Sequence, residues 1–205
     1  TSFTADGGTL IFHKSTYGYD MYALLIRQDG NTERALLTSD YRETNGVLSP
    51  DARWLAYESD ESGQLEIYVS PFPDVAAGRE RISIDGGSRP HWHPDGNELF
   101  YIDQYDAELS GAMMAVSFDQ ETGRRSGTPQ LLFEGIFHSP LQGQGRQLYD
   151  VSADGERFFA KHEDATAEAV TDFYVLDGDN PTSIASSVRM ARENARMLRH
   201  LISTE

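Results

Sequence analysis

The sequence predicts an all-β protein, a β-propeller of about four antiparallel four-stranded blades followed by a C-terminal α-helix. Three observations lead to this prediction. One phrase of a tight turn and an apolar strand occurs four times, its copies lie about one blade length apart, and no helical period is found before residue 180. The residues after 180 carry a helical pattern instead.

The four copies of the phrase begin at Thr4, Ser49, His93 and Ser152, which are spaced 45, 44 and 59 residues apart. In each copy an aspartate can bond to nearby backbone amides, and the turn requires a next residue that accepts a positive φ, as glycine does. That next residue is glycine in three copies and Ala52 in the second. We therefore expect the second turn either to avoid the left-handed region or to be slightly strained.

Each copy predicts the same strands in the same order. A short inner strand ends at Phe3, Leu48, Trp92 and Val151. Second strands are expected at 10–13, 54–58, 98–102 and 157–161, third strands at 20–26, 66–71, 113–118 and 172–176, and outer strands at 35–37, 80–84 and 130–133. The approximate repeats are 1–46, 47–90, 91–148 and 149–178, followed by a helix at 179–205.

Two local features modify this scheme. Pro71 cannot donate a ladder hydrogen bond, so its strand should end there or become an edge. The third copy is about 15 residues longer than its neighbours, and the Gly- and Gln-rich stretch 134–147 predicts a long connection before the last blade. Trp54 and Trp92 fall at or beside apolar positions of the repeat, which predicts that both are buried between blades.

Three stretches resemble the TolB-type propeller repeat: 49–73, which begins Ser-Pro-Asp-Ala-Arg-Trp-Leu-Ala-Tyr, and the segments 82–96 and 149–158. The resemblance is closest to the propeller region C-terminal to bacterial serine/threonine protein kinases. It extends to the propellers of prolyl-oligopeptidase-like peptidases. It implies a bacterial protein in a periplasmic or other extracytoplasmic compartment. The chain departs from these relatives, which have six or more blades, in offering about four and in ending with a helix.

The helix is predicted from Asn180 and Pro181, which suit an N-cap and a first helical position. Its apolar residues are spaced as a heptad seam. They are Ile184, Val188, Ala191, Ala195, Leu198 and Ile202. A stripe of four arginines lies beside the seam. The seam could pack on the propeller, mediate self-association or lie on a membrane surface, although it lacks the Trp and Phe that favour the last.

The composition limits the partners of the chain. The formal net charge of −16 makes broad nucleic-acid binding unfavourable. The absence of cysteine excludes disulfides and zinc–thiolate sites. No apolar run is long enough to predict a membrane span.

The sequence predicts no catalytic constellation, metal site or cofactor. It contains neither the Gly-x-Ser-x-Gly nucleophile motif nor the kinase His-Arg-Asp and Asp-Phe-Gly motifs. His91 and His93 flank Trp92 and could present two imidazoles on one strand face. However, His93 occupies the turn-capping position of the repeat, and no third ligand can be identified.

Propellers usually bind their ligands or partners on one face, near the central channel. Repeat alignment places Asn45, Arg89, His91 and Asp150 at the expected channel mouth, where they either bind a ligand or only line a wet channel. We refer to these four as the channel-mouth residues.

These observations favour a non-catalytic binding or scaffolding propeller that recognises a protein or a small ligand within a larger bacterial protein. The alternative is an accessory propeller of a serine peptidase or protein kinase whose catalytic domain lies outside this chain. A free-standing enzyme would need paired carboxylates in a pocket. We also expect a homodimer, formed through the C-terminal helix or through an open blade edge.

Overall fold

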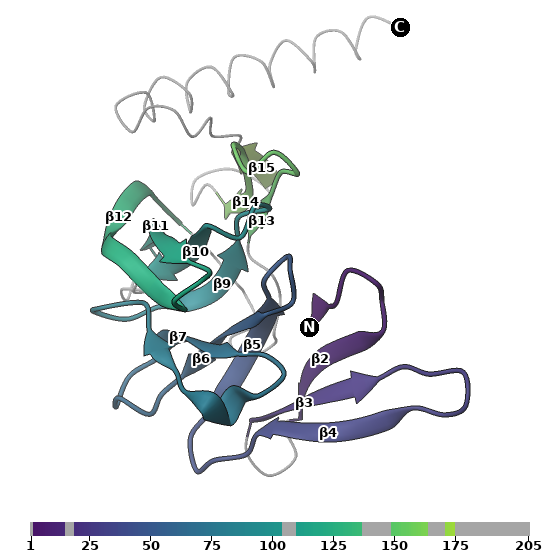
Figure 1. The fold of residues 1–205 in the computed structure, drawn as a ribbon. Helices are drawn as coiled ribbons and strands as arrows, with labels where there is room; N and C mark the ends of the chain where they lie inside the picture. The colour runs from purple at the N-terminus through teal and green to yellow at the C-terminus, as the bar shows by residue number, and fades with distance from the viewer. Residues whose placement is uncertain (1, 15–18, 104–109, 137–148, 164–170, 175–205) are drawn as a thin grey trace, which may run out of the picture.

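The computed structural model describes the whole chain except residues 1, 15–18, 104–109, 137–148, 164–170 and 175–205. The described residues form four antiparallel sheets that follow one another in an arc (Figure 1). Within these ranges, the one helical segment is a short 3-10 turn at Val75–Ala77. The prediction of an all-β propeller is therefore confirmed. The predicted helix and all six residues of its seam lie outside the described residues.

Each sheet is one blade, and its strands pair in sequence order. Blade 1 contains β1 (Ser2–Phe3), β2 (Thr9–Lys14), β3 (Asp20–Leu25) and β4 (Thr32–Leu37). Blade 2 contains β5 (Glu43–Leu48), β6 (Trp54–Ser59), β7 (Glu66–Pro71) and β8 (Glu80–Arg81). Blade 3 contains β9 (Ser88–Trp92), β10 (Glu98–Asp103), β11 (Ser110–Asp119) and β12 (Arg124–Ile136). Blade 4 contains β13 (Tyr149–Val151), β14 (Phe158–Glu163) and β15 (Thr171–Tyr174).

Each predicted strand has a counterpart, and β7 ends at Pro71 as predicted. Most strand ends shift by up to three residues, but β12 covers Arg124–Ile136 where 130–133 was predicted, and β8 covers only Glu80–Arg81 of the predicted 80–84. The end of the strand predicted at 172–176 lies outside the described residues. The third repeat differs from expectation. Part of its extra length lies in the long β11–β12 hairpin, whose strands have 10 and 13 residues against six in β3 and β4. The predicted connection at 134–147 therefore begins later than expected, because β12 continues to Ile136.

The repeated turn is held by its own side chains. The hydroxyl of Ser49 donates to Asp51 at 2.6 Å, and the backbone amide of Trp54 donates to the Ser49 hydroxyl at 3.0 Å. Thr4 and Ser152 make the equivalent bonds in their copies. This local network explains why one phrase folds the same way in each of these blades.

The hydrophobic core lies between blades rather than within them. Three clusters join successive pairs of blades, and each draws buried side chains from two neighbouring sheets. The first includes Ile11 and Tyr57, the second Val69 and Leu99, and the third Phe100 with Phe158. Because each blade buries both faces only when it has two neighbours, blade packing decides which side chains are exposed.

Side-chain hydrogen bonds also connect the inner strands around the arc. The backbone amide of Leu48 in β5 donates to the Ser2 hydroxyl in β1 at 3.2 Å. The Trp92 indole in β9 donates to the Val47 carbonyl in β5 at 3.2 Å. The Tyr149 hydroxyl in β13 donates to the Arg89 carbonyl in β9 at 2.7 Å. The four inner strands are thus linked in sequence.

Candidate binding sites

Two of the channel-mouth residues share an uncommon backbone conformation. Asn45 and Arg89 occupy equivalent positions of β5 and β9, and both have positive φ angles, 52° and 56°. The strand pairing is irregular beside both residues. Left-handed conformations of non-glycine residues are costly and concentrate at functional sites. These positions are therefore the strained points of the inner strands.

The conformation of Arg89 is fixed by both neighbouring blades. Its backbone amide donates to Oε1 of Glu58 in blade 2 at 2.6 Å, and its carbonyl accepts the Tyr149 hydroxyl from blade 4. The second oxygen of Glu58 accepts the Thr44 hydroxyl at 2.8 Å. Glu58 is buried, so each of its oxygens needs such a partner. The buried Glu58 carboxylate therefore stabilises the strained backbone of Arg89, and we refer to it, with its bonds to Arg89 and Thr44, as the Glu58 brace.

The other two channel-mouth residues meet each other. His91 Nε2 lies 3.4 Å from Asp150 Oδ1, and its Nδ1 lies 2.8 Å from the Trp92 carbonyl oxygen. Asp150 is largely exposed and His91 is half-buried. The structure thus pairs the two side chains that repeat alignment had placed at equivalent positions of β9 and β13.

His13 of blade 1 is influenced by charged side chains of other segments. Burial lowers the pKa of His13, and the charges of Arg42 and Arg89 lower it further, whereas Glu58 raises it. Arg42 also lies over the Tyr19 ring at 4.7 Å. His13, Arg42 and Glu58 were not among the sequence candidates. His13 and Glu58 could have been found, because both fall at the same position of the repeat.

Glu43 is a buried carboxylate beside this group. Its Oε1 accepts the Ser39 hydroxyl, while its Oε2 is buried and has no hydrogen-bond partner. Burial raises the pKa of Glu43, and the nearby Asp20 and Asp60 also raise it. The side chain therefore favours its protonated form more than an exposed glutamate does.

The His93 side chain contacts Asp95 within its own β-turn. Its Nδ1 accepts the Asp95 amide at 3.2 Å and lies 2.7 Å from Asp95 Oδ1. The ring also fits closely against Gly155 of the next blade, where an added Cβ would meet it at 1.8 Å. Within the described ranges, no group of three or more His, Asp or Glu side chains could hold a metal ion.

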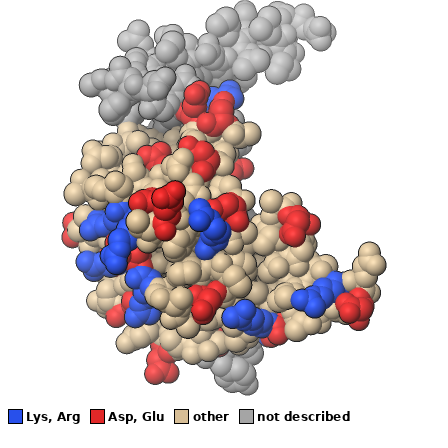
Figure 2. Space-filling view, in the orientation of Figure 1, with Lys and Arg blue, Asp and Glu red and all other residues tan. Residues whose placement is uncertain are grey.

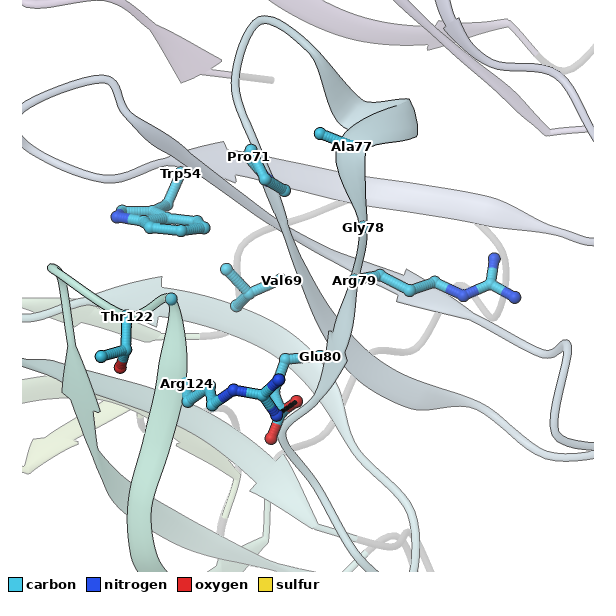
Figure 3. Close-up of a pocket in the computed structure, with 10 residues that line it drawn as sticks. Trp54, Val69, Pro71, Ala77, Gly78, Arg79, Glu80, Thr122 and Arg124 are labelled. Atoms are coloured by element: carbon cyan, nitrogen blue, oxygen red, sulfur yellow. Dashed lines mark ion pairs between the residues drawn. The ribbon is translucent and has the colours of Figure 1, made fainter.

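A second candidate site is a pocket between blades 2 and 3 (Figure 3). Its volume is about 210 Å³. It lies at the end of β6 that holds Trp54, whereas Glu58 lies near the other end of that strand. The lining residues are Trp54, Val69, Pro71, Ala77, Gly78, Arg79, Glu80, Thr122, Gly123 and Arg124.

The predicted burial is confirmed for Trp92 but not for Trp54, which lines the pocket. Trp92 is 4% exposed and lies in the core between blades 2 and 3, as predicted. Trp54 packs against the same core but remains only partly buried, because one side of its ring lines the pocket. The repeat pattern identified the apolar position but not the surface beside it.

The solved structures similar to this chain are propellers. TolB from Acinetobacter baumannii is 17% identical with a TM-score of 0.62, and the match covers 87% of this chain and 40% of that one. A protein assigned as TolB from Agrobacterium tumefaciens is 23% identical with a TM-score of 0.54, covering 66% and 48%. An oligogalacturonate lyase solved with manganese is 14% identical with a TM-score of 0.57, covering 88% and 50%. The chain therefore has the fold of TolB-like β-propellers, and it spans half or less of each of these structures.

Sequence comparisons cover less of the chain. An uncharacterized protein of Agrobacterium fabrum is 29% identical over 91 residues, which are 44% of this chain and 30% of that protein. A family model described as a predicted alpha-helical domain with a conserved ER motif matches residues 118–205. The strands that the structure describes between Phe118 and Tyr174 do not have that helical character. The part of the match after residue 174 lies outside the described residues.

Proposed function

We propose that this chain is a non-catalytic recognition domain whose inner-strand face binds a carboxylate-bearing ligand or partner segment. The observation that carries the proposal is the strained conformation of Arg89, held from both sides by Glu58 and Tyr149. Glycine would adopt the same backbone at lower cost, and left-handed non-glycine residues concentrate at functional sites. We infer that the strained backbone is retained because the arginine side chain is needed at this position.

The charge around this position favours an anionic ligand. The positive charges of Arg42 and Arg89 both lower the pKa of His13, and the Arg42 guanidinium lies 4.7 Å from the centre of the Tyr19 ring, in a strongly acidic chain. Guanidinium groups bind carboxylates with directional hydrogen bonds. The half-buried Asn45 lies at the equivalent point of the neighbouring inner strand and adds an amide donor and acceptor.

The contacts of His91 and His93 support a binding role rather than a catalytic one. The contacts of His91 and His93 go to a backbone carbonyl and to carboxylates, not to a hydroxyl that a histidine could activate. The sequence also lacks the nucleophile and kinase motifs. We therefore expect no turnover of peptide, ester or glycoside substrates by this chain. Hydrolysis that is lost in Arg89→Gly would contradict this.

Thermal unfolding with succinate, glutarate and citrate tests the binding proposal. A ligand that binds only the folded state raises Tm, and the increase grows with the logarithm of the ligand concentration above Kd. We expect at least one carboxylate to raise the Tm of the wild type and not that of Arg89→Gly, whose backbone can keep the same φ. Arg157→Gln, at a turn of blade 4, is the matched control for loss of a positive charge and should retain the response. Equal responses of all three proteins would contradict the proposal.

We further propose an extracytoplasmic, most simply periplasmic, compartment. The support is the resemblance to TolB-type repeats together with the TolB fold of the similar structures. Among the described residues, no helix is long and apolar enough to cross a membrane. Fractionation of cells that express the protein from its own gene tests the compartment, and recovery only with cytoplasmic markers would refute it.

A further inference from the structure

The pocket between blades 2 and 3 has a wall that is already held in place. The Trp54 indole donates to the Gln120 carbonyl at 3.2 Å, and its ring meets Phe118 edge-on at 5.4 Å between centroids. The β11–β12 turn lies directly on the ring, since a Cβ added to Gly123 would come within 2.1 Å of it. Trp54 therefore needs no rearrangement to receive a ligand, which reduces the cost of binding.

The remaining walls divide the pocket into an apolar and a charged half (Figure 3). Val69, Pro71 and Ala77 lie on the apolar side with Trp54. On the other side Arg124 lies 3.5 Å from Glu80, and its side chain is 73% exposed. Arg79 contributes only its stem, because its guanidinium points away from the indole and pairs with Glu61 at 2.6 Å.

The size of the pocket limits its occupant. Sites for whole small ligands usually enclose about 300–1,000 Å³, whereas this pocket has about 210 Å³. That volume suits one large side chain. Aromatic side chains inserted into preformed pockets are the usual anchors of protein–protein interfaces. A ring that enters here can stack on Trp54 or meet it edge-on.

The charged side of the pocket determines which residue of the partner is favoured next to the inserted aromatic side chain. Glu80 is half-buried, whereas the neighbouring Arg124 extends into solvent with a guanidinium that can donate several hydrogen bonds. Where β12 lies in Figure 1, Figure 2 shows several basic side chains close together, with acidic ones beside them. A carboxylate that follows the inserted ring would therefore meet Arg124.

We propose that this pocket is a docking site for a partner polypeptide, which inserts an aromatic side chain against Trp54 and places an adjacent carboxylate on Arg124. The site lies at the opposite end of blade 2 from the Glu58 brace and does not use the channel-mouth residues. The chain then holds two recognition surfaces, of which this one takes a protein.

Trp54 itself can report the binding, because the chain has two tryptophans and Trp92→Phe leaves Trp54 as the only one. The probe is the peptide acetyl-Ala-Phe-Asp-Ala-amide, titrated while indole fluorescence is recorded. We expect a saturable change with about millimolar affinity, as suits an isolated anchor. Replacing Phe by Ala in the peptide should weaken binding at least about tenfold. Replacing Asp by Asn should weaken it about twofold to fivefold, the range of an exposed ion pair.

Two variants test whether the peptide binds in the pocket. Ala77→Leu fills the cavity from an exposed position and should abolish the response while the circular dichroism and Tm remain unchanged. Arg124→Gln should make the Asp and Asn peptides bind equally, as a double-mutant cycle requires of a direct pair. Equal binding of the Phe and Ala peptides, or no saturable response in a folded protein, would overturn the proposal.

The channel-mouth variant separates this proposal from the proposed function. Arg89→Gly should leave peptide binding unchanged. If Arg89→Gly abolishes peptide binding and Ala77→Leu does not, the peptide binds at the channel mouth and the docking site is refuted. A Trp54 signal that changes with protein concentration alone, and that is lost in Ala77→Leu, would show that a second copy occupies the pocket. This result would also overturn the proposal of a distinct partner.

Discussion

At the scale of single residues, Ala52 is the exception in the repeated turn. The equivalent Gly7, Gly96 and Gly155 have φ angles of 68°, 77° and 78°, and Ala52 follows them with 56°. Of the two alternatives for this turn, the structure takes the strained one. The bonds from Ser49 and Arg53 to Asp51 outweigh the penalty of the alanine side chain.

Ala52→Gly should therefore stabilise the protein. Relief of the left-handed strain exceeds the greater freedom of glycine in the unfolded chain, and we expect the free energy of unfolding to rise by about 1 kcal/mol. Urea unfolding measures it. Gly96→Ala is the opposite control, because its Cβ would lie 3.0 Å from the Gln120 side chain. Its free energy of unfolding should fall, and a decrease for Ala52→Gly would contradict the argument.

Glu43 gives a prediction about pH. Burial raises its pKa in the folded state, so folding favours the protonated form. The contribution of Glu43 to stability is then largest below its unfolded pKa and is lost as the pH rises through the higher folded pKa. Glu43→Gln removes this dependence. The stability of the variant relative to the wild type should therefore increase from acidic to neutral pH, as measured by urea unfolding at several pH values. A difference that is constant with pH would refute the role of this carboxylate.

At the scale of elements, the repeated turn made the strands predictable because its bonds are local. Ser49, Asp51 and Trp54 lie within six residues, so the sequence alone shows their relation. The left-handed Arg89 was not predictable in this way. It depends on Glu58, which lies 31 residues away and belongs to another blade.

The pocket was unpredictable for the same reason. Its walls come from β6–β8 and from the β11–β12 turn, which meet only when blades 2 and 3 pack. Nothing in the local pattern around Trp54 or Arg124 indicates the other. By contrast, His91 and Asp150 were brought together by repeat alignment, because equivalent residues of successive inner strands lie at the same level.

The seam between blades 2 and 3 depends on Trp92. Its indole meets Phe118 at 5.0 Å and bonds to the Val47 carbonyl. Trp92→Ala should lower the free energy of unfolding by about 3–5 kcal/mol through cavity formation and loss of this bond. Trp54→Ala should cost less because Trp54 is only partly buried. Iodide should quench Trp54 and spare Trp92 in single-tryptophan variants, and equal quenching would contradict the assigned burial.

At the scale of the whole molecule, one face of blade 1 carries the aromatic pair of a blade seam, and none of the described blades packs on that face. Phe12 and Tyr22 stack at 5.9 Å and 27°, and the equivalent Tyr57 and Tyr68 of blade 2 stack at 6.0 Å and 26°. The pair in blade 2 is buried against blade 1, whereas Phe12 and Tyr22 are partly exposed, with Lys14 over the Tyr22 ring. Among the described residues, the aromatic pair of blade 2 is therefore buried by a neighbouring blade, whereas the equivalent pair of blade 1 is partly exposed.

This face of blade 1 is a surface through which two copies of the chain could form the predicted dimer. An uncovered apolar seam favours association, and so does the predicted helical seam at 181–205. Light scattering at several concentrations should show a dimer that dissociates on dilution. Tyr22→Ser should weaken the dimer if blade 1 forms the contact, and deletion of 181–205 should weaken it if the helix does. Leu131→Ser, at an exposed position of β12, is the control for loss of surface apolar area. A protein that remains monomeric at every concentration, with unchanged stability after the deletion, would refute both routes.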